Sequence, residues 1–502
     1  MILENGVVLT MDPSLPRAAA LAIAGEWVAG GVGTHERALA TPDRVDLRGR
    51  CVLPGLTDSH VHFPTWALAQ GELRLDEAAT RAEAVARVAG ALADVPRTGW
   101  LRGTGWRDVG WEAPPTRQAL DDVTGDVPTA LMAKDYHSLW LNSAALARAN
   151  GDLAVDGGVV EVDERGEPTG VLREQSAWRF RELHARPGLE ELVEASRRGL
   201  RIANARGVTA IHDKDGWLGA LTVWQRLRRQ ESLTLRVWQS VPHDRLDALA
   251  AVGVESGLGD DLLRLGYLKV FMDGTLASQT ARMLDGSGVE ITSGKELAEI
   301  VRRAARAAFP VAVHAIGDGA NRAALDAFEE TEADWRPRGL RQRIEHAQLL
   351  APEDLSRFAH LGVAASVQFS HAPSDRDLAD RFWEGGSEAA YAYRSLVASG
   401  ATVANGSDAP VEELDPLLGV RAGVTRTLDD RGGWHPEEAL TVEEALRAST
   451  VAPAWLSGDE RRRGRLVPGC LADLVVLDRD PLSCPPEELE EVHVVATMLG
   501  GR

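Results

Sequence analysis

The chain has 502 residues, and its 75 acidic and 55 basic side chains give a formal net charge of −20. This acidic balance argues against a nucleic-acid-binding protein, which normally carries a basic patch or stripe. A content of 44% hydrophobic and 26% charged residues is that of ordinary folded domains and excludes a wholly disordered chain.

Three widely spaced cysteines, Cys51, Cys470 and Cys484, form no disulfide framework and no C-x-x-C pair. The first residues lack the basic and apolar runs of a signal peptide, and no run reaches the roughly 18 apolar residues of a membrane span. We therefore expect a cytoplasmic protein with a small-molecule substrate, no nucleic-acid partner and no membrane association. A homodimer is compatible with a chain of this size, but no sequence feature tests it.

Both ends of the chain are rich in short apolar runs separated by turn residues. Residues 2–9 contain the turn signal Asn5-Gly6, and residues 18–23 and 27–28 flank Gly25-Glu26 as in a hairpin. Residues 470–477 and 492–498 are equally β-rich. These patterns predict a composite β-domain built from residues 1–54 and 463–502.

The middle of the chain, residues 55–462, alternates short apolar runs with amphipathic, helix-like segments. Such alternation indicates a parallel sheet, and eight units are the number that closes a (β/α)₈ barrel of the TIM type in the α/β class. The runs are residues 51–62, 208–213, 233–241, 263–272, 309–314, 342–348, 363–369 and 401–408. The gap between the first two runs is too long for one helix, so we predict an inserted subdomain at about residues 71–187, after the first strand.

Residues at the carboxyl ends of barrel strands point into the active site of such a fold. Six of the 13 histidines fall at or just past the ends of the predicted strands, together with one lysine and one aspartate. These residues are His60, His62, His212, Lys269, His314, His346, His371 and Asp408.

His60 and His62 are two residues apart on a strand, so both imidazoles leave the same face and can bind one metal ion at ~2.0–2.1 Å. Two loop histidines would give the same short pattern. His314 and His346 each end an apolar run and are candidates for a second metal pair, although a buried histidine is more often a hydrogen-bonded core residue. Asp408 could ligate a metal and take the proton of a bound water, or could simply cap a helix.

Lys269 lies within an apolar run, and lysine is rare in this chain: the others are Lys134, Lys214 and Lys295. Burying an isolated ammonium is costly, so such a lysine has a depressed pKa or altered chemistry. A neutral amine can add CO₂ to give a carbamate that bridges two metal ions. The ordinary alternative is a side chain that snorkels out of the strand end or pairs with Asp273.

Taken together, these motifs resemble the amidohydrolase superfamily of metal-dependent hydrolases. Residues 54–62 are similar to its first-strand signature, and residues 269–281 resemble the fourth-strand motif of amidohydrolase family 3, a group that includes N-substituted formamide deformylase. Further similar segments extend the resemblance over nearly the whole chain. They are residues 137–146, 169–174, 314–318, 343–347, 406–411 and 469–475.

The resemblance implies a binuclear metal centre. It would place His60, His62 and Asp408 on one ion, His314 and His346 on the second, and a carbamylated Lys269 between them. The chain departs from the family pattern at Arg107, Gln279 and Phe369, none of which is a proposed ligand. All three could line the substrate site, so no particular substrate follows from the resemblance.

We therefore predict a hydrolase of a non-peptide, amide-like C–N bond that uses two divalent ions, most simply zinc, with Asp408 as the catalytic proton acceptor and donor. His137, His212, His371 and Trp106 are candidates for contact with substrate, against the alternative that they are surface or core residues. Two other functions remain open: a single-metal deaminase of a cyclic amine, which would not need Lys269, and an inactive relative that serves as a binding protein.

Overall fold

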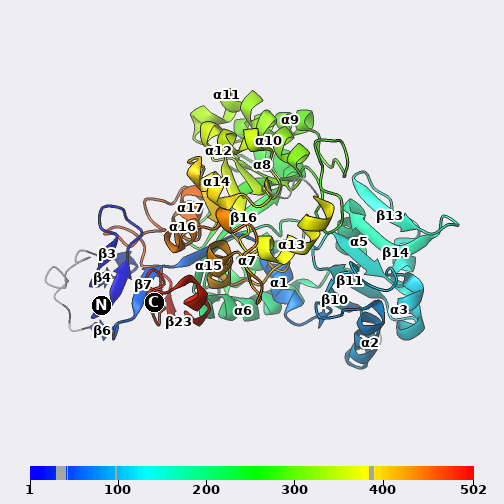
Figure 1. Ribbon diagram of the computed structural model, residues 1–502, viewed down its shortest axis with the longest axis horizontal. Coiled ribbons are helices and arrows are strands. Elements are labelled where there is room, and N and C mark those ends of the chain that lie inside the picture. Colours follow the sequence, from blue (N-terminus) through cyan, green and yellow to red (C-terminus); the bar gives the residue numbers. More distant parts are fainter. Residues whose placement is uncertain (30–40, 42, 96–98, 384–388) are drawn as a thin grey trace.

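The computed structural model describes residues 1–29, 41, 43–95, 99–383 and 389–502. Three parts lie side by side in Figure 1: a β-rich part that contains both ends of the chain, a central barrel ringed by helices, and a second β-rich part formed by the segment after the first barrel strand. The fold is thus the predicted TIM-like barrel with an additional β-domain and an insertion.

Eight strands form the barrel sheet, and every pair of neighbours in it runs parallel. In sheet order they are β8 (Leu56–Val61), β15 (Val208–Asp213), β16 (Arg236–Pro242), β17 (Leu263–Phe271), β18 (Val311–Ala315), β19 (Arg343–His346), β20 (Ala364–Val367) and β21 (Val403–Asn405). The two edge strands meet just beyond β21, because the Asp408 amide donates to the His60 carbonyl at 2.7 Å and the His62 amide donates to that of Ala409 at 2.8 Å. The line along which β8 and the segment after β21 close the barrel is called the seam below, and it lies at the predicted metal site.

Amphipathic helices cover the barrel and bury their apolar faces against it. In α9, for example, Leu297, Val301 and Ala304 are buried in the main core, while the N-cap Ser293 accepts a hydrogen bond from the Glu296 amide. The helices around the barrel are α1 (Phe63–Ala69), α6 (Leu189–Ala205), α7 (Ala220–Arg229), α8 (Leu246–Ala251), α9 (Gly294–Arg306), α10 (Asp318–Glu330), α11 (Glu332–Trp335), α12 (Leu355–Leu361), α13 (His371–Phe382), α14 (Tyr393–Ala398), α15 (Pro416–Thr425), α16 (Val442–Ala448) and α17 (Val451–Leu456).

The first apolar run, residues 51–62, proves to be two strands that belong to different sheets. β7 (Cys51–Pro54) pairs with strands of the terminal β-part, whereas β8 belongs to the barrel. Gly55 separates them, and its backbone approaches β15 so closely that a Cβ there would lie 2.2 Å from Thr209 Oγ1. The single predicted strand is therefore corrected to two, because the chain changes sheets at a position where only glycine fits.

Segments from both ends of the chain make up two further sheets. One has the order β5-β4-β1-β6 and the other β23-β22-β7-β2-β3. The expected hairpin at Gly25-Glu26 is present, since β4 and β5 pair antiparallel across it. The strands are β1 (Ile2–Glu4), β2 (Val7–Leu9), β3 (Arg17–Ala18), β4 (Leu21–Ala24), β5 (Trp27–Val28), β6 (Arg44–Asp46), β22 (Leu474–Leu477) and β23 (Val494–Met498).

The inserted part lies between α1 and α6 in the chain and contains a six-stranded sheet of order β13-β14-β12-β11-β10-β9. Its own core includes Leu131, Trp106 and Trp140. The elements are β9 (Leu73–Arg74), α2 (Arg81–Ala91), β10 (Leu101–Trp106), α3 (Arg117–Thr124), β11 (Thr129–Ala133), β12 (Ser138–Leu141), α4 (Ser143–Leu146), β13 (Gly158–Val162), β14 (Pro168–Glu174) and α5 (Gln175–His184). Among the described residues, no helix has both the length and the apolar character that a membrane crossing requires.

Candidate metal centre

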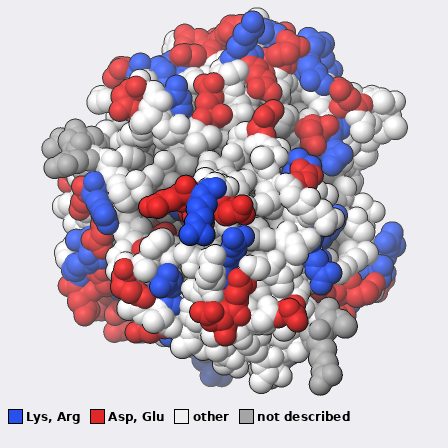
Figure 2. All heavy atoms as spheres, turned by 90° about the vertical axis from the view of Figure 1, so that its right-hand side faces the viewer, with Lys and Arg blue, Asp and Glu red and all other residues white. Residues whose placement is uncertain are grey.

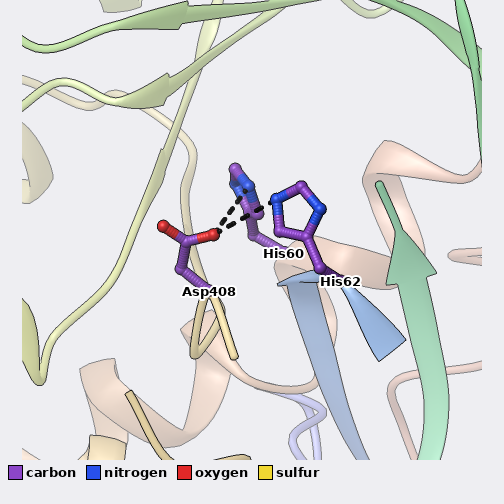
Figure 3. A group of neighbouring side chains, drawn as sticks. All are labelled: His60, His62 and Asp408. Carbon is purple, nitrogen blue, oxygen red and sulfur yellow. Dashed lines mark ion pairs between the residues drawn. The ribbon is translucent and has the colours of Figure 1, made fainter. Parts of the chain in front are cut away.

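The seam of the barrel brings His60, His62 and Asp408 together (Figure 3). Asp408 Oδ1 lies 3.3 Å from His60 Nε2 and 3.6 Å from His62 Nε2. Asp408 has a φ of 57°, and its amide is bound to His60, so the backbone turns the carboxylate back over the two imidazoles. One carboxylate and two imidazoles in this arrangement form a plausible ligand set for a divalent ion.

The neighbouring strand ends add His314 from β18, His346 from β19 and Lys269 from β17. The ring centroid of His346 lies 4.5 Å from that of His314 and 4.8 Å from that of His60. Lys269 Nζ is fully buried and has no hydrogen-bond partner among the described residues, and burial lowers the pKa of its amine to about 8. All six residues expected at the metal centre thus line one cavity.

An acceptor oxygen behind each predicted ligand histidine fixes its tautomer. A nitrogen that donates to such an oxygen carries the proton and leaves the other nitrogen basic, as metal binding requires. Burial also lowers the pKa of His60, His314 and His346 well below the usual value, which favours the neutral imidazole. The donated bonds run from His60 Nδ1 to Glu345 (2.8 Å), from His62 Nδ1 to Asp215 (2.8 Å), from His346 Nδ1 to Gln368 (2.8 Å) and from His314 Nε2 to the Gly274 carbonyl (3.0 Å).

Glu345 is the centre of a buried polar network beneath His60. Lys214 Nζ donates to Glu345 Oε1 at 2.6 Å, and Arg343 Nη2 donates to Oε2 at 2.8 Å. Burial would raise the pKa of Glu345, but the positive charges of Arg343 and Lys214 hold it well below its usual range. Sequence reasoning did not assign a role to Glu345 or Lys214. The available signal was two charged residues, Arg343 and Glu345, inside a buried strand, since such charges persist only when paired.

His371 also reaches the centre, but with a different protonation pattern. Its Nε2 lies 3.9 Å from Asp408 Oδ2, and together with His346 and Asp408 it forms a second group with metal-ligand spacing. However, Gln348 Nε2 donates to His371 Nδ1 at 3.0 Å, which leaves the proton of the ring on Nε2. His371 therefore presents a donor, which suits contact with a substrate better than ligation of a metal.

His137 lines the cavity from the inserted part, where its Nδ1 donates to Glu174 at 2.6 Å. Burial would lower the pKa of His137, but the charge of Glu174 and this hydrogen bond outweigh it and raise the pKa. The raised pKa increases the share of the imidazolium form, which can donate to an oxygen atom in the cavity.

The other two residues expected to contact substrate lie elsewhere. Trp106 is 1% exposed in the core of the inserted sheet, donates to the Leu131 carbonyl at 2.8 Å and packs against Trp140. His212 is buried inside the barrel, where its Nδ1 accepts from Arg343 at 3.0 Å. Neither is among the cavity-lining residues of the described chain, so the structure places both away from the candidate substrate site.

Two of the three departures from the family pattern also lie away from the cavity. Phe369 is fully buried against Tyr393, and Gln279 is exposed. Arg107, by contrast, follows β10 and lines a small side pocket beside the metal centre.

The main cavity has a volume of about 360 Å³ and opens beside the inserted part. Phe271 lies between Trp178 and Trp217, at centroid distances of 4.8 and 5.5 Å, and the three rings form an apolar wall next to His314. Figure 2 shows acidic and basic side chains interspersed over the face beside the inserted part. On the described part of that face neither sign of charge forms a continuous surface that would steer a charged substrate.

A parallel barrel with this histidine-rich cluster at its carboxyl end is the architecture of a metal-dependent hydrolase. The sequence profile described as "Amidohydrolase family" matches residues 43–502, and the chain belongs to that family. It is 30% identical to Protein LONG AFTER FAR-RED 3 of Arabidopsis thaliana, in an alignment that covers 100% of this chain and 91% of the relative. It is 27% identical to N-substituted formamide deformylase of Arthrobacter pascens, with 100% and 97% coverage. An uncharacterized metal-dependent hydrolase from Pyrococcus horikoshii has a similar solved structure, with a TM-score of 0.80, 28% identity and coverage of 97% and 99%.

Proposed function

We propose that this amidohydrolase cleaves an amide-like, non-peptide C–N bond with the help of two divalent ions, most simply zinc. The observation that carries the proposal is the position of Asp408. Its Oδ1 faces His60 and His62, while its Oδ2 lies 3.8 Å from His346 Nδ1, the nitrogen that donates to Gln368. One carboxylate thus lies between the two predicted ligand pairs, where it can ligate an ion and accept a proton from an attacking water.

The donor set fits such a centre. The predicted ligand histidines each donate one ring N–H to an acceptor oxygen, and the Lys269 amine is buried without a hydrogen-bond partner among the described residues. In the proposal His60, His62 and Asp408 hold one ion, and His314 and His346 hold the other. Ions bound there would polarise the substrate carbonyl and lower the pKa of a water molecule to near neutral.

Lys269 would contribute as a carbamate. Its neutral amine forms an N–C bond to CO₂ and releases one proton to solvent, which leaves an anionic group with two oxygens that can span two ions. A pKa of about 8 supports this step, because a substantial fraction of the amine is then neutral near physiological pH.

Asp408 and His137 would carry out the proton and charge chemistry. Asp408 lies beside the predicted ligand histidines, where its carboxylate could accept a proton from a water molecule activated at the centre. Asp408 accepts the proton of the water and passes it to the departing amine, which otherwise leaves poorly. The imidazolium of His137 donates a hydrogen bond to the oxygen on which negative charge develops.

The proposal is tested by metal analysis of the purified protein combined with a panel of N-substituted amides, dipeptides and cyclic amines. We expect about two ions per chain and amine release from the amides. Asp408→Asn should lower kcat by about 10²-fold or more, because it removes the proton acceptor, whereas the exposed Asp122→Asn on α3 should leave kcat unchanged. Ammonia release from a cyclic amine with one ion per chain would identify a deaminase instead. Absence of both metal and turnover would favour a binding protein.

A further inference from the structure

A side pocket of about 40 Å³ adjoins the metal centre and the main cavity. Both spaces are lined by Asp135, His137, His314, His346, Asp408 and Val411, but the far side of the side pocket is formed by residues that do not line the main cavity. These residues come from the inserted part, the end of β19 and helix α13. They include Arg107, Gln348, His371 and Asp375.

Three of these side chains present buried polar atoms without a hydrogen-bond partner among the described residues. The atoms are Arg107 Nε, Gln348 Oε1 and His371 Nε2. Gln348 and His371 are only 3% and 4% exposed. Buried polar groups are nearly always satisfied, so three unsatisfied atoms on residues that line one small pocket favour a polar group there over an apolar one.

The hydrogen-bond network defines what that ligand must offer. Gln348 Nε2 donates a hydrogen bond to His371 Nδ1, so the ring proton of His371 is on Nε2, which acts as a donor. Arg107 Nε is a second donor, and Gln348 Oε1 is an acceptor. Two donors and one acceptor are complementary to a hydroxyl group, whose oxygen accepts and whose proton is donated.

The charges around the pocket favour a neutral hydroxyl over a second carboxylate. Arg107 supplies one positive charge, with its Nη2 3.7 Å from Asp375 Oδ1, and His137, whose pKa is raised, supplies a second when it is protonated. Asp135, Asp375 and Asp408 also line the pocket and would repel an anion.

The volume limits the size of the group. A water molecule needs roughly 10–15 Å³ on this scale, so the side pocket holds a group of about two or three non-hydrogen atoms. The main cavity, about nine times larger with its aromatic wall, takes the rest of the substrate.

We propose that the side pocket recognises a short hydroxyl-bearing acyl group, such as hydroxyacetyl, attached to a bulkier apolar amine. This inference rests on the proposed amide hydrolysis and names its substrate class. Arg107, Gln348 and His371 are then specificity-determining residues, and Arg107 is a departure from the family pattern that gives this chain its own preference.

The test compares two anilides of 4-nitroaniline, with hydroxyacetyl and propionyl as the acyl groups. The two acyl groups have the same number of non-hydrogen atoms and differ only in a hydroxyl for a methyl. We expect kcat/KM to favour the hydroxyacetyl anilide by about 10-fold or more, because a site built to hydrogen-bond a hydroxyl rejects the analogue without it. Arg107→Met should reduce this ratio, and the exposed Arg87→Met on α2 should preserve it. Hydrolysis of both anilides with equal kcat/KM would overturn the proposal.

A binding measurement separates this inference from the proposed reaction. Hydroxyacetamide and propionamide are titrated calorimetrically into the metal-loaded wild-type, Arg107→Met and Arg87→Met proteins. The inference predicts tighter binding of hydroxyacetamide to the wild-type and Arg87→Met proteins, with the difference reduced in Arg107→Met. If no anilide is hydrolysed but this pattern appears, the proposed reaction fails and the pocket assignment stands. Equal affinity of the wild-type protein for the two amides would contradict the assignment of the side pocket to a hydroxyl group.

Discussion

Glu345 shows how a single residue outside the ligand set can control the metal centre. Its carboxylate accepts a hydrogen bond from His60 Nδ1 and pairs with Lys214 and Arg343. None of these side chains is more than 1% exposed. The orientation of a predicted metal-binding imidazole thus depends on a charge network one layer deeper in the barrel.

We predict that Glu345→Gln weakens metal binding about 10- to 100-fold, because His60 loses the carboxylate that fixes its tautomer. The free energy of unfolding should fall by about 3–5 kcal/mol, since two buried cations lose their counter-ion. Metal titration and urea denaturation measure the two effects. Glu353→Gln, which alters an exposed pair with Arg322, serves as the matched control. Unchanged metal affinity in folded Glu345→Gln would contradict the role assigned to this carboxylate.

The contrast between the six metal-centre candidates and Arg107 shows what the sequence could predict of the site. The convergence of His60, Lys269 and Asp408 on one cavity was predictable because each lies at or near the end of an apolar run, and parallel strands end at the same face of a barrel. For Arg107 the sequence indicated only that it could line the substrate site, as could Gln279 and Phe369, because its place depends on a long-range contact between the loop after β10 and helix α13. His212 also lies at the end of a strand, but its side chain is buried deeper in the barrel, where Arg343 donates a hydrogen bond to its Nδ1. Proximity to a strand end does not specify which side chain reaches the cavity.

Strand β8 and the segment after β21 close the barrel through Asp58 as well as through the backbone. The carboxylate of Asp58 accepts from the Ser407 amide at 3.1 Å, from Ser407 Oγ at 2.5 Å and from the His60 amide at 3.0 Å. Burial raises the pKa of Asp58 to about 6. The seam therefore titrates in a pH range in which the carboxyl of an unfolded chain, with a pKa of about 3.9, is already charged.

The raised pKa of Asp58 determines the direction in which the unfolding free energy changes with pH. Between about pH 4 and pH 6 the folded protein holds a proton on Asp58 that the unfolded chain has lost. The stabilisation from this group is therefore complete below pH 4 and is lost as the pH rises through 6. Asp58→Asn should make the slope of the unfolding free energy against pH less negative, by up to about 1.4 kcal/mol per pH unit in this window. Urea denaturation of metal-free protein at several pH values measures the slope, and equal slopes for the wild type and Asp58→Asn would refute the assignment. Asp122→Asn is the control.

The junction between β7 and β8 depends on the absence of a side chain at Gly55. We predict that Gly55→Ala lowers the unfolding free energy by about 1–3 kcal/mol, because its Cβ would lie 2.2 Å from Thr209 Oγ1. In Gly90→Ala on the exposed side of α2, by contrast, the new Cβ meets no atom within 4 Å, and the substitution should stabilise by about 0.5–1 kcal/mol. Thermal or urea unfolding of both variants measures the difference. An unchanged unfolding free energy in Gly55→Ala would show that β15 can shift to accommodate the added Cβ.

At the scale of the whole molecule, the eight barrel strands and the β-rich ends were predictable from periodicity and turn residues. The division of residues 51–62 between two sheets was not, because an uninterrupted apolar run looks the same whether it stays in one sheet or crosses into another. Only the packing of Gly55 against β15 reveals the change.

Metal removal should separate stability from activity. The charged groups beneath the centre pair with one another, as Glu345 does with Lys214, so we expect a chelator to abolish hydrolysis while the circular dichroism spectrum is retained. Bound ions should add about 2.7 kcal/mol of stability at a concentration 100 times their Kd. Activity should return with zinc and bicarbonate together more fully than with zinc alone, because the Lys269 carbamate requires CO₂. Equal recovery without added CO₂, in CO₂-free buffer, would argue against the carbamate.

The seam of the barrel also sets the order of events during synthesis. His60 leaves the ribosome early, but Asp408, whose amide closes the barrel onto the His60 carbonyl, follows more than three hundred residues later. A nascent chain that carries the other five proposed metal-centre residues but not Asp408 has neither a closed barrel nor a complete ligand set. If the proposed centre is correct, metal capture is thereby coupled to near-completion of the fold, and a ribosome-bound fragment that ends before β21 has no competent centre.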